Sequence, residues 1–488
     1  MPRKIIVLII LVIFLFTGCA APSAESEETN QSVTLSPCQL SVDEVRGHID
    51  AECGSVSVLE NPQDPNSRQI KLNVAVIPAV SRDPAPDPVF FLAGGPGEAA
   101  TESFLIVAEA FDSINQDRDI VLVDQRGTGK SNPLFCASAA EMIDLEDEDI
   151  QGYLQSCLAN LDADPRFYHT SVAMHDLDLV RQALGYDKVN LYGVSYGTRA
   201  ALVYMRLFPE QVRAVILDGA VPLGWNLGTD TGENAQQAID LIFQRCQDDP
   251  GCSEAFPDLK REFQALQDQL HQEPVEVTIP DPITAEEQTV TVDATYFASI
   301  IFNLSYSPET VALIPLLIHT TFEQNDFSLI AAQGLSVMSS LFSRMSDGMR
   351  YSVLCAEDLP FYQPPDVHEG YLGDIFGEGF VDICNTWPQG EIPAGFHDPV
   401  RSNAPVLIVS GEADPVTPPE NGDAAADTLP NSVHLVLPGQ GHVNIFRGCV
   451  PRLASQFIEN GSLEGLETEC VDAVEPFPFF TSFAGPQP

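Results

Sequence analysis

Short apolar runs recur along the chain, and each is closed by glycine, proline or aspartate. Runs of this length, rich in β-branched residues, are typical of the fully buried strands of a parallel sheet. Helical patterns lie between the runs, the clearest at 172–185 and 198–208. This alternation predicts a doubly wound α/β domain with a mostly parallel sheet. The runs are IKLNVAVIPAV (70–80), VFFLAGGPG (89–97), DIVLVDQRGTG (119–129), KVNLYGVSYG (188–197), VRAVILDGA (212–220), APVLIVSGEAD (404–414) and SVHLVLPGQGH (432–442).

The alternation stops between residues 222 and 400, where helical patterns predominate, and a strand pattern returns at Val406. A helical insertion between the strands of such a sheet predicts a cap over the strand ends, where α/β proteins bind their ligands. We therefore expect a first part of the core at 37–221, a mostly helical cap at 222–400 and a second part of the core at 401–488.

The N-terminus has the pattern of a secretory signal. Arg3 and Lys4 precede the apolar run IIVLIILVIFLF, which ends in Thr17-Gly18-Cys19. The stretch FTGC resembles the lipobox of bacterial lipoproteins. This resemblance implies that Cys19 is lipidated and becomes the new N-terminus.

The lipoprotein hypothesis assigns residues 1–18 to a signal peptide and 19–36, rich in Ala, Ser, Glu and Thr, to a flexible tether. It predicts an exported protein that a lipid anchors to a membrane on the extracytoplasmic side. The alternative is an ordinary signal peptide cut after Ala20 or Ala21, and then a secreted or periplasmic protein.

Cysteine usage agrees with export. The chain has eleven cysteines, and without Cys19 an even number remains, as suits an oxidising compartment. Their connectivity does not follow from the sequence. No Cys/His spacing indicates a metal site, and no cofactor is implied. The cysteines fall into neighbouring couples: Cys38 with Cys53, Cys136 with Cys157, Cys246 with Cys252, Cys355 with Cys384, and Cys449 with Cys470.

Charge and one failed motif exclude two classes of function. With 70 acidic against 23 basic residues, the chain is not expected to bind nucleic acid or to adhere electrostatically to anionic lipid. A cationic substrate would suit this charge, although an acidic surface is also ordinary for a soluble extracytoplasmic protein. The stretch DQRGTGKS (124–131) ends like a phosphate-binding loop, but Asp124 stands where such a loop needs glycine.

The motif GVSYG (193–197) lies between the strand pattern KVNLY and the helical pattern TRAALVYMRLF. In that context G-x-S-x-G is the nucleophile elbow of a hydrolase. The turn is so sharp that the positions two residues to either side of the serine must be small. We therefore predict that Ser195 is a nucleophile, held above the sheet at the start of a helix.

A serine hydroxyl needs a base, and the base needs a group that holds its tautomer. In the elbow fold these follow the serine in the order Asp or Glu, then His. Asp414 follows one strand pattern in the turn DPVTPP, and His442 follows the next on the loop GQGHVN. Loops at the ends of parallel strands converge, so Ser195, Asp414 and His442 are the predicted triad.

Four other residues fit these roles less well. Glu412 competes for the acid role but lies within the strand end. His434 lies inside a strand pattern, and His169 and His175 precede the nucleophile, against the expected order.

The tetrahedral intermediate also needs hydrogen-bond donors for its oxyanion. One is expected to be the backbone N–H of Tyr196, directly after the nucleophile. The other is expected from AGGPG (93–97), and Gly95 is the chosen donor, because glycine lets the backbone approach the substrate oxygen closely.

Together, GGPG, DQRGTGKS, GVSYGT, GEADPVTPP and GQGH resemble the proline iminopeptidase and tripeptidyl aminopeptidase branch of the α/β-hydrolases. The likeness covers roughly residues 85–222 and 400–450. It implies an α/β-hydrolase fold with a helical cap and makes DQRGTGKS part of the scaffold near the site. Proline iminopeptidases usually have histidine where this chain has Ala93, which leaves the peptide specificity open.

The resemblance further implies that a free α-amine of the substrate binds acidic groups near the cap. The stretch CAED offers Glu357 and Asp358 for this role. The alternative is that the two are an ordinary solvated pair.

These features lead us to expect an extracytoplasmic serine exopeptidase that acts through an acyl-enzyme on peptides. A carboxylesterase acting on small esters with the same triad is one alternative. A noncatalytic peptide-binding lipoprotein that keeps the fold is an alternative of another class.

Overall fold

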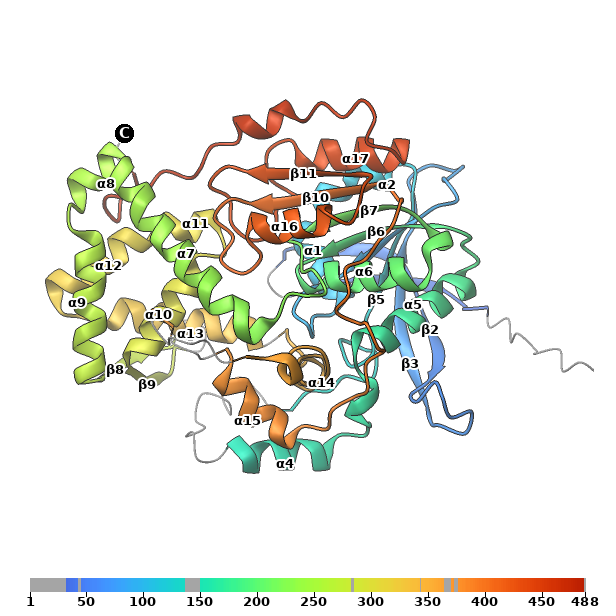
Figure 1. Cartoon of the computed structure of the whole chain (residues 1–488), viewed down its shortest axis with the longest axis horizontal. Coiled ribbons are helices and arrows are strands. Elements are labelled where there is room, and N and C mark those ends of the chain that lie inside the picture. The colour runs from blue at the N-terminus through green and yellow to red at the C-terminus, as the bar shows by residue number, and fades with distance from the viewer. Residues whose placement is uncertain are drawn as a thin grey trace, which may run out of the picture. The chain divides into compact units, whose positions relative to one another are not determined.

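The computed structural model describes residues 32–42, 45–136, 150–281, 285–342, 344–363, 370–372 and 376–486. Within these residues, nine strands form one sheet in the order β1-β2-β3-β5-β4-β6-β7-β10-β11 (Figure 1). Neighbours from β1 to β5 pair antiparallel, and those from β5 to β11 pair parallel. The strands are β1 Ser36–Leu40, β2 Ile49–Leu59, β3 Gln69–Ile77, β4 Val89–Leu92, β5 Ile120–Val123, β6 Val189–Val194, β7 Val212–Asp218, β10 Val406–Gly411 and β11 Ser432–Leu437.

Every apolar run of the sequence forms a strand of this sheet, which confirms the predicted fold class. All residues of β4, β5, β6 and β10 are buried, because helices cover both faces of the sheet. This double covering explains why these strands lack the alternation of half-exposed ones. One face packs against α5 (Thr170–Leu184), α6 (Tyr196–Leu207) and α16 (Pro419–Ala426), and the other against α1 (Ala100–Val107), α2 (Asp112–Asn115) and α17 (Val450–Asn460).

Between β7 and β10 the chain forms helices and one hairpin with a hydrophobic cluster of their own, and we call this region the cap. In Figure 1 its green and yellow helices lie beside the sheet domain. The sequence predicts its helices but not the hairpin. The elements are α7 Leu227–Asp248, α8 Pro250–Ala255, α9 Leu259–Gln272, β8 Val275–Pro280, β9 Glu287–Val292, α10 Ala294–Leu304, α11 Pro308–Val311, α12 Ile314–Gln324, α13 Ser328–Phe342, α14 Asp347–Glu357 and α15 Glu378–Thr386.

Two segments from outside the cap pack onto it. Helix α4 (Ile150–Asn160) precedes the nucleophile in sequence, yet Leu154 shares a buried cluster with Trp387 at the end of α15. The C-terminal segment after α17 also reaches the cap (Figure 1). There Phe479 joins the cap's cluster under the guanidinium of Arg245, and the N–H of Phe480 donates to the carbonyl of Ala312 at 2.9 Å.

The structure joins the five neighbouring cysteine couples as disulfides, as suits an exported protein. Along the described part of the chain we find no helix that is long and apolar enough to span a membrane. Cys19 and the predicted signal peptide lie outside the described residues.

Candidate active site

Ser195 occupies the sharp turn between β6 and α6. Its backbone has φ 54° and ψ −125°, a conformation that non-glycine residues rarely adopt. The turn leaves no room for side chains around it. A Cβ at Gly193 would lie 2.4 Å from the carbonyl oxygen of Gly197, and a Cβ at Gly197 would lie 2.0 Å from that of Leu92. The structure therefore places Ser195 in the strained elbow that the sequence predicts.

Asp414 and His442 meet at the ends of β10 and β11. His442 Nδ1 lies 2.7 Å from Asp414 Oδ2, and the two side chains are only 8% and 0% exposed. The backbone N–H groups of Val416 and Thr417 donate to the other carboxylate oxygen at 2.9 and 2.8 Å. Glu412 lies on the same turn but accepts from the N–H of Gly439 instead.

Electrostatics favour the ionised form of Asp414 and make His442 more basic. Burial opposes ionisation of Asp414, but the charge and hydrogen bond of His442 together with backbone N–H donors hold the Asp414 pKa below its usual value. For His442, burial favours the neutral ring. The charge and hydrogen bond of Asp414 outweigh it and raise the pKa of His442. A histidine held this way can accept a proton from a nucleophile and keep it through the attack.

Thr417 is a member of the site that the sequence analysis missed. Its Oγ1 donates to Asp414 Oδ2 at 2.7 Å and lies 3.2 Å from His442 Nδ1. The hydroxyl thus fixes the carboxylate oxygen that faces the histidine. Its place three residues after Asp414, in the turn DPVT, is the only signal in the sequence.

Asp218, at the end of β7, was also missed, and it links the nucleophile to the histidine loop. Its backbone carbonyl accepts from the N–H of Ser195 at 2.9 Å. Its buried carboxylate accepts from the N–H of Asn444 at 2.8 and 2.9 Å and of Ile445 at 2.8 Å, and from the hydroxyl of Tyr192 at 2.8 Å. Burial raises the pKa of Asp218 to about 6, despite these donors.

The cap touches the histidine directly. Between α10 and α11, the carbonyl oxygen of Tyr306 accepts from the backbone N–H of His442 at 2.7 Å. The two rings meet edge to face with centroids 5.5 Å apart. A Cβ at Gly441 would lie 2.3 Å from the same carbonyl oxygen, so this approach requires glycine.

The predicted oxyanion loop packs against the nucleophile. A Cβ at Gly94 would lie 3.3 Å from Ser195 Cβ, and Gly95 and Gly97 have φ of 105° and 117°. The cap pins the loop, because the N–H of Ser346 donates to the carbonyl of Gly97 at 3.0 Å. Gly95 and Tyr196, the predicted donors, thus belong to the two segments that adjoin Ser195.

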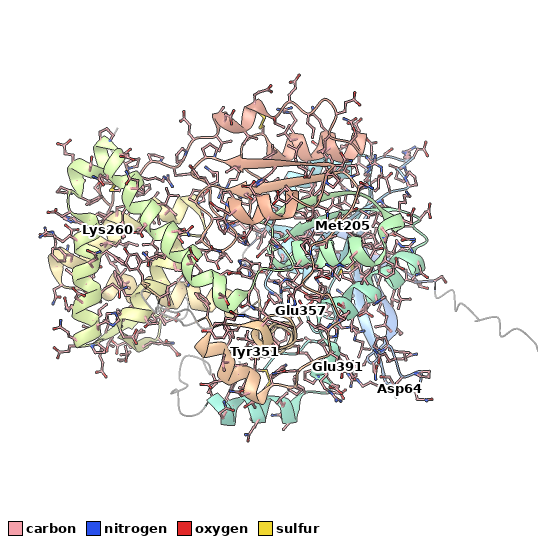
Figure 2. All side chains as sticks on the ribbon, in the orientation of Figure 1. Asp64, Met205, Lys260, Tyr351, Glu357 and Glu391 are labelled. Carbon is pink, nitrogen blue, oxygen red and sulfur yellow. A yellow bond between two sulfur atoms is a disulfide. The ribbon has the colours of Figure 1, made fainter. Side chains whose placement is uncertain are left out.

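Glu357 and Asp358 are not the ordinary solvated pair that the alternative interpretation describes. Both are buried, and Arg199 Nη1 lies 3.6 Å from Glu357 Oε2 and 2.9 Å from Asp358 Oδ1. Thr170 donates to Glu357 through its N–H at 2.7 Å and its hydroxyl at 2.9 Å. The pair is not solvated, and its two carboxylates share the single guanidinium of Arg199. Glu357 lies between α14 and the sheet domain (Figure 2), and the amine-binding role of the pair stays a prediction.

The remaining histidines have structural surroundings. Nε2 of His434 lies 2.9 Å from the hydroxyl of Ser410, and the ring of His175 packs edge to face on Phe208. His169 is buried, and burial lowers its pKa to about 4. None of these contacts involves Ser195. Among the described residues, no cluster of three or more His, Cys, Asp or Glu side chains could hold a metal ion.

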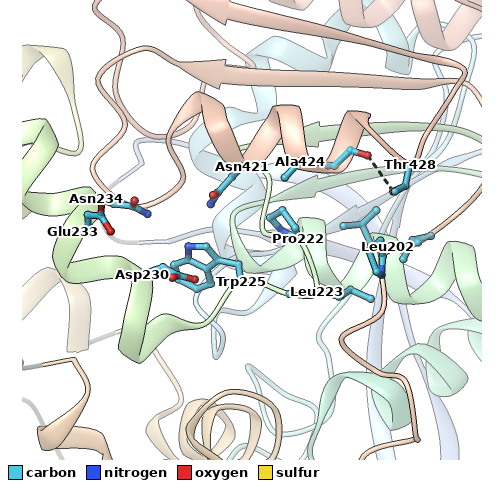
Figure 3. Close-up of a pocket in the computed structure, with 14 residues that line it drawn as sticks. Leu202, Pro222, Leu223, Trp225, Asp230, Glu233, Asn234, Asn421, Ala424 and Thr428 are labelled. Atoms are coloured by element: carbon cyan, nitrogen blue, oxygen red, sulfur yellow. Dashed lines mark hydrogen bonds between the residues drawn. The ribbon is translucent and has the colours of Figure 1, made fainter. Parts of the chain in front are cut away.

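A pocket of about 400 Å³ lies between α6, α7 and α16 (Figure 3). Trp225 and Asn421 line it, and the pocket adjoins the Asp414 loop because Asn234 Nδ2 donates to the carbonyl of Val416 at 2.9 Å. None of the predicted site residues lines this pocket.

Two protein families match this chain, and each match extends into the cap. The family described as "alpha/beta hydrolase fold" matches residues 87–245, and that described as "TAP-like protein" matches residues 370–470. The first stretch holds Ser195, and the second holds Asp414 and His442. The chain is an α/β-hydrolase.

This α/β-hydrolase has relatives with different named activities. It is 25% identical to "Serine protease Hip1" of Mycobacterium tuberculosis, over 90% of this chain and 91% of the relative. It is 26% identical to "Carboxylesterase B" of the same species, over 86% of each chain. It is 29% identical to "Tripeptidyl aminopeptidase" of Streptomyces lividans, over 35% of each. Family and relatives together identify an enzyme of the serine hydrolase class, with peptidases among its relatives.

Proposed function

We propose that this α/β-hydrolase is an exported serine exopeptidase that releases N-terminal residues or short peptides through an acyl-enzyme. The observation that carries the proposal is the 2.7 Å contact between His442 Nδ1 and Asp414 Oδ2. Asp218 connects the loop that bears this contact to the backbone of Ser195.

In the proposed mechanism, His442 Nε2 takes the proton of Ser195 Oγ as the oxygen attacks the substrate carbonyl. Asp414 keeps the proton on Nδ1 and stabilises the imidazolium that forms. The N–H groups of Tyr196 and Gly95 stabilise the oxyanion. His442 then donates its proton to the leaving amine, and a water activated by the same ring hydrolyses the acyl-enzyme.

Two observations favour short peptides as substrates. The cap contacts the histidine loop through Tyr306 and the oxyanion loop through Ser346, so it covers the surroundings of the nucleophile. Such a cap favours chain ends over the middle of a folded protein. Relatives named as a serine protease and a tripeptidyl aminopeptidase point to the same class.

Purified wild-type protein tests the proposal. We expect it to react with a fluorophosphonate probe and to release 4-nitroaniline from unblocked peptide anilides. Hydrolysis of 4-nitrophenyl esters alone would instead identify a carboxylesterase, the second candidate, which the relative of that name supports. No reaction with the probe would leave a noncatalytic peptide-binding protein.

We propose further that Cys19 carries a lipid anchor, on the strength of the FTGC stretch. Expressed in a bacterium that processes lipoproteins, the wild type should fractionate with membranes and Cys19→Ser should not. Recovery of both forms in the soluble fraction would favour the ordinary signal peptide.

A further inference from the structure

Glu98 follows the oxyanion loop directly, and its side chain turns back over that loop. Its Oε2 lies 3.5 Å from the position that a Cβ would take at Gly94, and Ser195 Cβ lies 3.3 Å from the same position. Glu98 Oε2 is therefore separated from Ser195 Cβ by no more than the sum of these two short distances. Glycine at 94 leaves the space between them free of a side chain.

The charge of Glu98 acts on both rings that border the site. After burial and the bonded Asp414, it is among the negative charges that raise the pKa of His442. After burial and Asp414, it also contributes to the raised pKa of Tyr306. His442 belongs to the sheet domain and Tyr306 to the cap, so the charge of Glu98 acts on residues of both regions.

Within the described residues, Glu98 has no cationic partner. The one hydrogen bond of the Glu98 carboxylate comes from the hydroxyl of Ser103 at 3.0 Å, and the residue is half-buried. Of the other carboxylates near the nucleophile, Asp358 faces Arg199, Asp414 faces His442, and Asp218 accepts hydrogen bonds from three residues. Glu98 thus adds an unbalanced negative charge to the site.

Contacts with the cap hold the backbone of Glu98 in place. It forms an isolated antiparallel bridge with Met345 of the cap, beside the hydrogen bond from Ser346 to Gly97. A rigid backbone on one side and Ser103 on the other fix the carboxylate, as precise recognition requires.

We infer, on the basis of the proposed exopeptidase function, that Glu98 binds the α-ammonium of the residue whose carbonyl Ser195 attacks. That ammonium is two bonds from the reacting carbon. In a tripeptidyl substrate, two further residues intervene, each spanning roughly 3.3–3.6 Å when extended. A carboxylate this close to Ser195 therefore matches enzymes that release one N-terminal residue at a time. Glu98, and not the pair in CAED, confers the specificity for unblocked chain ends.

Three anilides with one leaving group test this inference: alanyl-, N-acetylalanyl- and trialanyl-4-nitroanilide. Wild type should cleave the alanyl compound with the highest kcat/KM, roughly tenfold to a hundredfold above the acetylated one, as a charge-assisted hydrogen bond provides. Glu98→Gln should remove that advantage, so that kcat/KM for the alanyl compound falls to about the value for the acetylated one. Glu109→Gln, which removes an exposed carboxylate from the next helical segment, should leave all ratios unchanged.

The ratio of kcat/KM for the free substrate to kcat/KM for the acetylated substrate distinguishes amine binding from other roles of Glu98. If Glu98→Gln slows all substrates equally, Glu98 acts only on His442 and the inference is wrong. If wild type prefers the trialanyl compound and the variant keeps the free-to-acetylated ratio, the amine binds elsewhere, although the exopeptidase function stands. If wild type hydrolyses esters and cleaves none of the anilides, the exopeptidase function itself fails. Even if the variant does not fold, a wild type that prefers the trialanyl compound contradicts the inferred position of the α-ammonium at Glu98.

Discussion

The carboxylate of Asp218 accepts two hydrogen bonds from the backbone N–H of Asn444, at 2.8 and 2.9 Å. Asn444 lies two residues beyond His442, and the residue between them, Val443, has a φ of 69°. The strained loop therefore depends on a buried anion that is distant in sequence. Because the carbonyl of Asp218 also accepts from Ser195, one residue sets the position of both the base and the nucleophile.

Replacing Asp218 with asparagine should misplace the histidine loop. The NH₂ group of the amide would face the N–H and O–H groups that donate to the carboxylate in the wild type. At least one N–H of the loop would then lose its acceptor. We expect kcat to fall by at least tenfold and the Tm to drop. Stopped assays and thermal unfolding would measure both, and an Asp218→Asn enzyme with wild-type kcat would refute the positioning role.

Ser195→Ala should reduce kcat by several powers of ten, because members of such a triad act as one unit. His442→Ala should be nearly as severe. The unfolding transition of both variants should stay close to that of the wild type. A Ser195→Ala protein that kept comparable activity and still bound the fluorophosphonate would contradict the proposed mechanism.

Thr417→Val should slow the chemistry without weakening substrate binding. The change removes the donor that holds Asp414 Oδ2 against His442, a hydrogen bond to a charged group. We expect kcat to fall about tenfold with KM unchanged, from the free energy of such a bond. Thr428→Val is the matched control, because the hydroxyl of Thr428 has one hydrogen bond among the described residues, to the carbonyl of Ala425 on α16 at 3.5 Å. Equal losses in the two variants would assign the effect to packing.

Glu357 should make the protein more stable in mild acid than at alkaline pH. Burial raises its pKa to about 7, above the usual value of 4.5, so the folded state binds the proton more tightly than the unfolded state. The stability that this group contributes is complete below pH 4.5 and is lost as the pH rises through about 7. Glu357→Gln should flatten the fall in Tm over this range. An unchanged pH profile in the variant would exclude Glu357 as its source.

The sequence predicted most of the sheet, the elbow at Ser195 and the closeness of Asp414 to His442 for a clear physical reason. Strands that are buried on both faces consist of apolar residues and are therefore visible as apolar runs in the sequence. The elbow needs glycine two residues to either side of Ser195. Strand β2 and the hairpin β8–β9 were missed because their residues alternate between buried and exposed, with Glu, Ser and Thr at the exposed positions.

The rest of the site depends on contacts between distant segments. Asp218 resembles any aspartate that closes a strand until the fold brings it to Asn444, a separation of 226 residues. The ion pair of the CAED segment could not be predicted for the same reason, because Asp358 is separated from Arg199 by 159 residues. Local patterns in the sequence carry no information about such pairs.

Phe479 and Phe480 pack among the cap helices, so the C-terminal segment is structurally part of the cap although it follows the sheet domain in sequence. Four segments therefore join the cap to the sheet domain: its entry after β7, its exit before β10, the segment that contains α4, and this tail. The cap is thus not an independent module. A chimera that exchanges caps between relatives has to exchange the last residues with them, and a purification tag fused to the C-terminus extends from the cap surface.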